Sequence, residues 1–181
     1  MSMHSSSLTT FSGRGVGVAP AAAVSAASST GENQHITFTV GSEEYGINIL
    51  AVREIRGWTP ETKLPNLPHY VRGVINLRGA IIPIVDLRIR FGGGATDATK
   101  HHVVIVVLAG DGKMWGLLAD TISDILAIPH DQVRPTPGIG RELSDDAYLT
   151  GLFTAHQRMV ALLDINRLFS QAKSEFEAAG D

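Results

Sequence analysis

A block of sequence that occurs twice limits the fold of this chain more than any other feature. Residues 73–91 align with residues 151–169 without a gap, so that Gly73 falls on Gly151 and Asp86 falls on Asp164. Each aspartate directly follows an apolar stretch. The simplest interpretation is that one small structural unit is present in two copies.

A second block supports this interpretation. Tyr45-Gly46 aligns with Trp115-Gly116, and Glu54-Ile55 then falls on Asp124-Ile125, again without a gap. Chance matching of common residues is the alternative, and two ungapped blocks in the same order make it the weaker one. The copies extend over about 35–91 and about 101–169. Surface outweighs core at that size, so we expect the copies to pack together and to form a groove between them.

The hydrophobic pattern within the copies is that of short β-strands. Ile36, Phe38 and Val40 alternate with polar residues, which is typical of a half-buried strand. The apolar run 102–108 is typical of a strand buried on both faces. Other strands are expected to begin at Tyr45 and to cover 71–77, 80–85, 114–118 and 160–163. The fold class is therefore mainly β, with small barrels or a sandwich.

One helix is predicted, at the C-terminal end. Asp164 can cap it, and apolar residues follow near helical spacing at Ile165, Leu168, Phe169 and Phe176. Residues 1–34 are rich in Ser, Ala, Gly and Thr and cannot bury enough surface to offset the entropy of ordering. We predict a disordered tail over 1–34, a folded domain over 35–170, and the end of the helix with a short tail over 171–181.

The composition excludes several classes of function. There is no cysteine, which rules out disulfides, cysteine-ligated zinc and a thiol nucleophile. The formal net charge of −3 lacks the basic excess of a duplex-binding protein. No apolar run approaches the ~20 residues that span a bilayer, and the N-terminus does not have the pattern of a signal peptide.

Candidate catalytic groups are few. His101 and His102 are adjacent, and adjacent side chains on a strand point to opposite faces, so the two cannot readily bind one metal ion. Asp86 and Asp164 could serve as an acid/base pair, but their equivalence in the repeat favours helix capping at both. There is no nucleophile elbow and no phosphate-binding loop. We expect no catalysis, no cofactor and no metal site.

The most distinctive stretch is Gly73-Val74-Ile75-Asn76-Leu77-Arg78-Gly79, which continues into Ile82-Pro83-Ile84-Val85-Asp86. Tyr45-Gly46-Ile47-Asn48-Ile49 stands upstream, and Ile128-Pro129 and Arg134-Pro135 stand downstream. In combination these motifs resemble the family of the bacterial chemotaxis coupling protein CheW, from His35 to about Phe169. The resemblance implies two intertwined, five-stranded, SH3-like barrels with a hydrophobic groove between them.

The resemblance also implies partners and a function. The partners are the cytoplasmic tip of methyl-accepting chemoreceptors and the regulatory domain of the histidine kinase CheA. The function is that of a non-enzymatic cytoplasmic adaptor, which couples the two and helps to build membrane-associated chemoreceptor arrays without inserting into the membrane. One alternative is a nucleic-acid-binding small β-barrel, which the acidic charge and few aromatic residues disfavour. The other is an adaptor of a chemosensory pathway that does not control motility.

One surface is expected to face the receptor. Arg78 stands at a glycine-flanked strand end, where it either holds this surface through its guanidinium geometry or satisfies backbone carbonyls between the halves. Ile55 is expected in the core, which leaves Val52 and Glu54 together on the other face of their strand. The full candidate set is Val52, Glu54, Gly73, Asn76, Arg78, Val103 and Val104.

Asn76 is expected to turn the chain or to bond its neighbours rather than to contact a partner directly, and at least one of Val103 and Val104 is expected to pack in the core. A second surface is expected to face the kinase. Arg134 begins a loop rich in Pro and Gly that also contains Gly138 and Ile139. Prolines stiffen such a loop and lower the entropy lost on binding.

Overall fold

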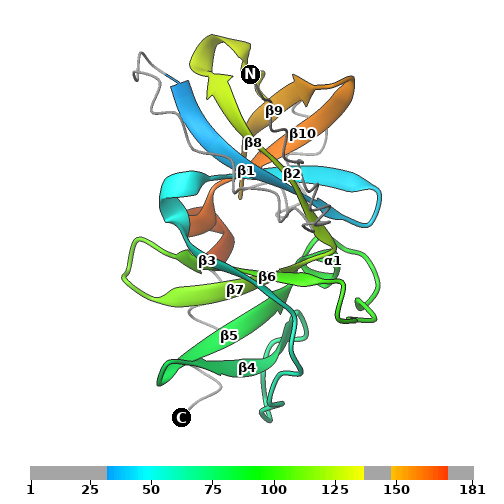
Figure 1. Cartoon of the computed structure of the whole chain (residues 1–181), viewed down its shortest axis with the longest axis vertical. Helices are drawn as coiled ribbons and strands as arrows, with labels where there is room; N and C mark the ends of the chain where they lie inside the picture. Colours follow the sequence, from blue (N-terminus) through cyan, green and yellow to red (C-terminus); the bar gives the residue numbers. More distant parts are fainter. Residues whose placement is uncertain (1–31, 137–147, 171–181) are drawn as a thin grey trace, which may run out of the picture. The chain divides into compact units, whose positions relative to one another are not determined.

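The computed structural model describes residues 32–136 and 148–170. Within these residues the chain forms ten strands in two five-stranded sheets (Figure 1). The strands are β1 (Glu32–Val40), β2 (Glu43–Asn48), β3 (Val52–Gly57), β4 (Val71–Leu77), β5 (Ala80–Asp86), β6 (Val103–Leu108), β7 (Met114–Ala119), β8 (Thr121–Pro129), β9 (Leu149–Ala155) and β10 (Arg158–Leu163). Short helical segments are η1 (Ile49–Ala51), α1 (Leu87–Arg90), η2 (His130–Gln132) and residues 165–170. No helix among the described residues is long and apolar enough to cross a membrane.

Each sheet takes strands from both sequence repeats. One sheet has the order β8-β1-β2-β10-β9 and is called barrel A; the other has the order β3-β6-β7-β5-β4 and is called barrel B. The β1–β2 hairpin of the first repeat thus joins three strands of the second, and the β6–β7 hairpin of the second joins three strands of the first. Parallel pairing of β2 with β10, and of β5 with β7, holds each hairpin in place. This exchange confirms the expected pair of intertwined, five-stranded barrels.

The largest buried apolar cluster of the described residues includes side chains from both barrels. Phe38 and Ile47 come from barrel A, and Ile105 and Leu117 come from barrel B. Smaller clusters fill each barrel separately: one in barrel B includes Ile82, Ile84 and Val106, and one in barrel A comprises Ile128, Val160 and Leu162. Because most of the burial is shared, neither barrel has a sufficient core of its own, as the size argument predicts.

Glycines in the middle of the strands confirm the internal repeat. A Cβ on Gly46 would lie 2.9 Å from Leu162 Cδ2, and a Cβ on Gly116 would collide with Ile84 Cδ1. Leu162 and Ile84 are themselves equivalent in the repeat, so the same packing occurs in both barrels. Each glycine lets a neighbouring strand bring a large apolar side chain across its backbone.

The predicted end segments are only partly within the described residues. β1 begins at Glu32, where it pairs with Pro129 of β8, so the prediction of disorder is wrong for residues 32–34. Residues 1–31 and 171–181 lie outside the described part, as does Phe176. The predicted helix after Asp164 is present over 165–170.

Candidate partner-binding surfaces

An ion pair joins the β4–β5 hairpin to β3. Arg78 Nη1 lies 3.0 Å from Glu54 Oε2, with the arginine side chain 78% exposed and the glutamate 27% exposed. β3 and β4 are the two edge strands of barrel B, so the pair links opposite edges of one sheet. The contact that the structure shows for Arg78 is therefore with a carboxylate, and not with backbone carbonyls between the halves.

The turn that carries Arg78 has a fixed geometry. Arg78 and Gly79 both have positive φ, at 51° and 90°, which suits the tight turn of a two-residue hairpin. Asn76 Oδ1 accepts a hydrogen bond of 2.8 Å from the Gly79 N–H. The prediction that Asn76 turns the chain or bonds its neighbours is thus confirmed.

A β-bulge in β3 separates two residues that were expected on one face. The register with β6 shifts between Val52 and Glu54, so that Val52 pairs with Val107 and Glu54 with Val106. Val107 belongs to the core shared by the barrels and Val106 to the interior of barrel B. Since paired residues lie on the same side of a sheet, Val52 and Glu54 face opposite sides, and the predicted shared face is wrong.

The prediction that Ile55 is a core residue is also wrong. Ile55 is 40% exposed. Its strand, β3, lies at the edge of the sheet and therefore has a neighbouring strand on one side only. Ile81, the cross-strand partner of Asn76, is 61% exposed, and Leu50 in η1 is 78% exposed. The sequence pattern did not identify these apolar surface residues, since an exposed isoleucine in a strand has the same pattern as a buried one.

Two of the predicted receptor residues lie inside the fold. Gly73 is buried, and a Cβ there would collide with the backbone oxygen of Thr62. Val104 is 1% exposed and belongs to the interior of barrel B, which confirms that one valine of the pair is in the core. Val103 is half-buried against the shared core. Gly73 and Val104 can shape the surface from within but do not form it.

The predicted kinase-facing loop is described only at its start. Arg134 is exposed, and its backbone exchanges two hydrogen bonds of 2.8 Å with Leu152 of β9. Gly138 and Ile139 lie outside the described residues. Arg134 is therefore held at the edge of barrel A by its main chain, with its side chain available to a partner.

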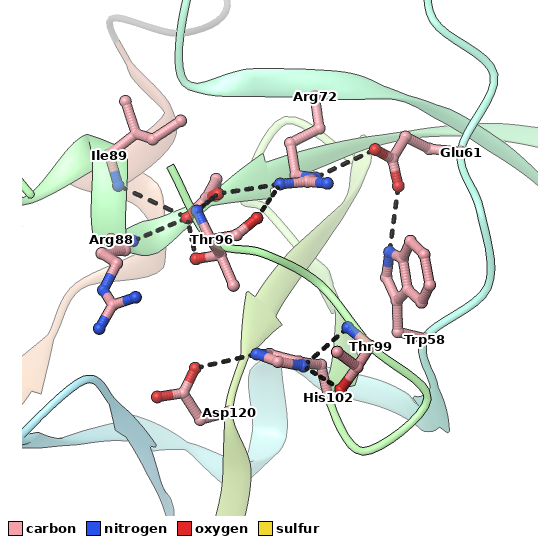
Figure 2. A network of polar contacts seen from close by, with 10 residues as sticks. Trp58, Glu61, Arg72, Arg88, Ile89, Thr96, Thr99, His102 and Asp120 are labelled. Atoms are coloured by element: carbon pink, nitrogen blue, oxygen red, sulfur yellow. Dashed lines mark hydrogen bonds and ion pairs between the residues drawn. The ribbon is translucent and has the colours of Figure 1, made fainter. Parts of the chain in front are cut away.

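A polar network crosses barrel B (Figure 2). Arg72 lies at its centre: Nε is 3.0 Å from Glu61 Oε1, and Nη1 donates to the Thr96 carbonyl at 2.7 Å and lies 3.3 Å from Asp86 Oδ2. Trp58 Nε1 donates to the other oxygen of Glu61 at 3.0 Å. Arg72, on β4, is thereby connected to Asp86 at the end of β5, to Glu61 before β4 and to Thr96 after β5.

The capping predicted for both aspartates is confirmed. Asp86 Oδ1 accepts hydrogen bonds from the N–H groups of Arg88 and Ile89 at 3.1 and 3.5 Å, and Asp164 Oδ1 accepts two in the same positions at 2.9 and 3.1 Å. Asp86 accepts two more from Thr96, from its N–H at 2.9 Å and from its hydroxyl at 2.8 Å. Helix capping accounts for both carboxylates, and the hydrogen bonds from Thr96 further satisfy the buried Asp86.

The adjacent histidines have separate surroundings. His102 Nδ1 accepts a hydrogen bond of 3.0 Å from the Thr99 N–H, and Nε2 lies 3.4 Å from Asp120 Oδ1 (Figure 2). His101 is exposed. Among residues 32–136 and 148–170 no three His, Asp or Glu side chains are grouped as a metal ion would require.

Comparison with known proteins identifies the family. A family model described as the CheW-like domain matches residues 34–173. The chain belongs to the CheW-like domain family. It is 43% identical over 145 residues to the probable chemotaxis protein CheW of Rhizobium etli, covering 80% of this chain and 92% of that protein. It is 42% identical over 137 residues to the chemotaxis protein CheW of Klebsiella aerogenes, covering 76% of this chain and 81% of that protein.

A solved structure agrees with this assignment. The crystal structure of the scaffolding protein CheW from Thermoanaerobacter tengcongensis matches with a TM-score of 0.69 at 30% identity, covering 77% of this chain and 88% of that chain. The CheW-like fold accounts for the two barrels, and the family favours a scaffold over an enzyme. The nucleic-acid-binding alternative is not favoured.

Proposed function

We propose that this CheW-like chain is a non-enzymatic cytoplasmic adaptor that couples methyl-accepting chemoreceptors to the histidine kinase CheA and helps to build their arrays. Membership of the CheW-like family carries the proposal, together with the relatives named as chemotaxis proteins and the neighbour named as a scaffolding protein. Two barrels that share a core but have separate outer surfaces suit a protein that holds two partners at a fixed geometry.

The proposed receptor-facing surface lies on barrel B around the β4–β5 hairpin. The Arg78–Glu54 pair fixes the hairpin against β3, and Asn76 fixes its turn. Ile81 adds exposed apolar area on the side of Asn76, because cross-strand partners share a face. Val52 and Val103, each half-buried against the core that the barrels share, are proposed as part of the same surface, and Gly73 and Val104 support it from within.

The proposed kinase-facing surface includes Arg134 on barrel A; Gly138 and Ile139, which are also proposed for it, lie outside the described residues. The exposed Arg134 side chain on an anchored backbone supports this proposal. An anchored arginine loses little backbone entropy when it binds, and its guanidinium can bond a carboxylate with fixed geometry.

A reconstituted signalling assay tests the coupling. Purified CheA is mixed with receptor signalling fragments on vesicles, with and without this protein, and kinase phosphorylation and co-sedimentation are measured. We expect the protein to sediment with receptor and to change kinase activity. An unchanged activity together with no co-sedimentation would refute the coupling function.

Two variants locate the receptor surface in the same assay. Arg78→Glu should weaken receptor co-sedimentation, because it sets two carboxylates against each other across barrel B. His156→Glu is the matched control, since His156 occupies the equivalent hairpin of barrel A and also has positive φ, 47°. Adding Glu54→Arg to Arg78→Glu restores the ion pair: recovered binding means that the pair positions the surface, whereas no recovery means that Arg78 itself contacts the receptor. Equal loss in Arg78→Glu and His156→Glu would argue against a surface on barrel B.

A further inference from the structure

A cavity lies against barrel A, at the place equivalent to the polar network of barrel B, and the end and turn of the β6–β7 hairpin (Leu108, Ala109, Gly110 and Gly112) line its other side. The cavity has a volume of about 850 Å³. Residues that line it include Ile128, Val133, Thr150, Leu162, Asp164 and Asn166. A cavity of this size can hold several side chains or a short peptide segment.

The internal repeat shows what occupies the equivalent space in barrel B. The lining residues Ile128, Val133, Thr150 and Asp164 correspond in the repeat to Trp58, Glu61, Arg72 and Asp86. The packing supports this correspondence: Glu61 Cγ lies beside Gly73, and Val133 Cγ1 lies beside the equivalent Gly151. Three of the four side chains are smaller in barrel A, with isoleucine for tryptophan, valine for glutamate and threonine for arginine. The space that the network fills in barrel B is therefore open in barrel A.

Barrel B completes its site with a cation and a strap of backbone. Arg72 supplies the cation that lies 3.3 Å from Asp86. Residues 92–102, which connect the two repeats, supply the strap: Thr96 bonds Asp86 through its N–H and its hydroxyl, and Ala98 packs on the barrel interior. In barrel A the repeat counterpart of this strap is residues 170–180, of which 171–180 lie outside the described residues.

Asp164 keeps the carboxylate, and Thr150 stands where barrel B has Arg72. The Asp164 side chain is 28% exposed, and the ion pair that the structure shows for it is with Arg167 on the surface, 3.5 Å from Oδ2. None of the described residues that line the cavity is a lysine or an arginine. The other titratable groups of the lining are His35 and His130. The cavity thus combines apolar walls with a carboxylate, and it would favour a positively charged group.

We propose that this cavity binds a short segment of a partner protein that places an arginine or lysine side chain beside Asp164. The segment supplies to barrel A the cation and the backbone that Arg72 and the strap supply to barrel B. That the partner is a component of the signalling complex rests on the proposed function, whereas the chemistry of the site does not.

A peptide titration of the full chain tests the chemistry. The probes are the capped tripeptide acetyl-Leu-Arg-Ala-amide and its citrulline counterpart, which has the same shape but no charge. Amide NMR signals of Gly110, Thr150 and Asn166 should shift saturably with the arginine peptide and much less with the citrulline peptide. Equal shifts with both peptides, or none at these residues, would overturn the proposal.

Two variants tie the binding to Asp164 and to the empty space. Asp164→Asn should weaken binding of the arginine peptide roughly tenfold or more, the factor expected for one hydrogen bond to a charged group. Asparagine caps a helix as well as aspartate does, so the fold is expected to be unchanged. Thr150→Arg installs the counterpart of Arg72 and should abolish peptide binding, whereas Thr154→Arg, on the same strand but not among the residues that line the cavity, should not. Undiminished binding in Asp164→Asn would overturn the proposal even if Thr150→Arg failed to fold.

A crosslinking experiment identifies the partner in the reconstituted complex. Ala51, which also lines the cavity, is replaced by p-benzoylphenylalanine, and the crosslinked peptides are sequenced. We expect a receptor or kinase segment with a basic residue at the crosslink. Crosslinks to this chain alone, or to partner segments without a basic residue, would overturn the partner assignment. If the wild-type protein coupled neither partner, the proposed function would fail, and the peptide titration would still decide the chemistry of the cavity.

Discussion

The two barrels are equivalent in the repeat, but the equivalent carboxylates in them have different surroundings. Asp86 in barrel B is fully buried and contacts Arg72 and Thr96 as well as the helix that it caps. Asp164 in barrel A caps its helix in the same way but is partly exposed, with Arg167 as its surface partner. The difference shows that capping is the role common to both copies, and that the polar network is an addition to one of them.

Burying the carboxylate of barrel B costs free energy, and this cost explains why so many polar groups contact it. A buried carboxylate is strongly unfavourable unless hydrogen bonds and an opposite charge replace its hydration. Barrel B provides both, and it takes Thr96 from the connection between the repeats to do so. Barrel A leaves its carboxylate near solvent, where water can hydrate it, and keeps the neighbouring space open.

Removal of each carboxylate should give the largest contrast between the barrels. Asp86→Ala leaves Arg72 and the Thr96 N–H without their buried partner, so we expect a loss of about 3–5 kcal/mol in the free energy of unfolding. Asp164→Ala loses a cap and a surface ion pair, which should cost about 1 kcal/mol. Urea unfolding of both variants measures the difference. Similar losses would mean that the network adds nothing beyond the cap.

The bridging glycines of the two barrels should both resist substitution, Gly73 more than Gly151. Gly73→Ala places a methyl group against the Thr62 carbonyl oxygen, and Gly151→Ala places one against the Val133 side chain and the Arg134 carbonyl oxygen. Gly73 also has a positive φ of 157°, which alanine rarely adopts. We expect a loss of about 1–3 kcal/mol in the free energy of unfolding for each, toward the upper end at Gly73. Gly57→Ala is the control, since nothing lies within 4 Å of a Cβ there. A loss at Gly151 as large as that at Gly73 would show that the positive φ adds no cost.

The repeat carried most of what could be predicted from the sequence. It predicted two equivalent β units and the capping at Asp86 and Asp164, which depend on local residue type and spacing. It did not predict that the hairpins β1–β2 and β6–β7 exchange between the units, because an exchanged hairpin buries the same residues as an unexchanged one. The resemblance to the family supplied that feature.

The receptor-facing surface was predicted less well, for reasons of geometry. The bulge in β3 reverses the alternation between Val52 and Glu54, and neither residue type indicates a bulge. Ile55 has the sequence pattern of a core residue, but its exposure depends on the position of β3 at the edge of its sheet. The partner of Arg78 was not predicted either, since Glu54 is far away in sequence and approaches it only when the barrel closes.

The hairpin tips test whether the ion pair of barrel B stabilises the protein. Arg78→Ala removes the pair with Glu54, yet the arginine is largely exposed and solvent screens the interaction. We therefore expect a loss of about 1 kcal/mol or less, which salt reduces further. His156→Ala, at the equivalent tip, should show no such dependence on salt. A large loss in Arg78→Ala that salt does not change would mean that the side chain stabilises barrel B through packing.

The smallest expected effect concerns Tyr45 and its repeat counterpart Trp115. Burial raises the pKa of Tyr45 above its usual value of 10.0, and the nearby charge of Glu43 raises it further. The folded state therefore favours the neutral phenol, so this contribution to stability is complete below pH 10 and is lost as the pH rises through the raised pKa. The stability difference between wild type and Tyr45→Phe should shift in favour of Tyr45→Phe above pH 10, whereas that between wild type and Trp115→Phe should stay constant, because indole does not titrate. Urea unfolding between pH 8 and pH 11 measures both, and parallel profiles for the two variants would show that Tyr45 ionises as readily in the folded chain as in the unfolded one.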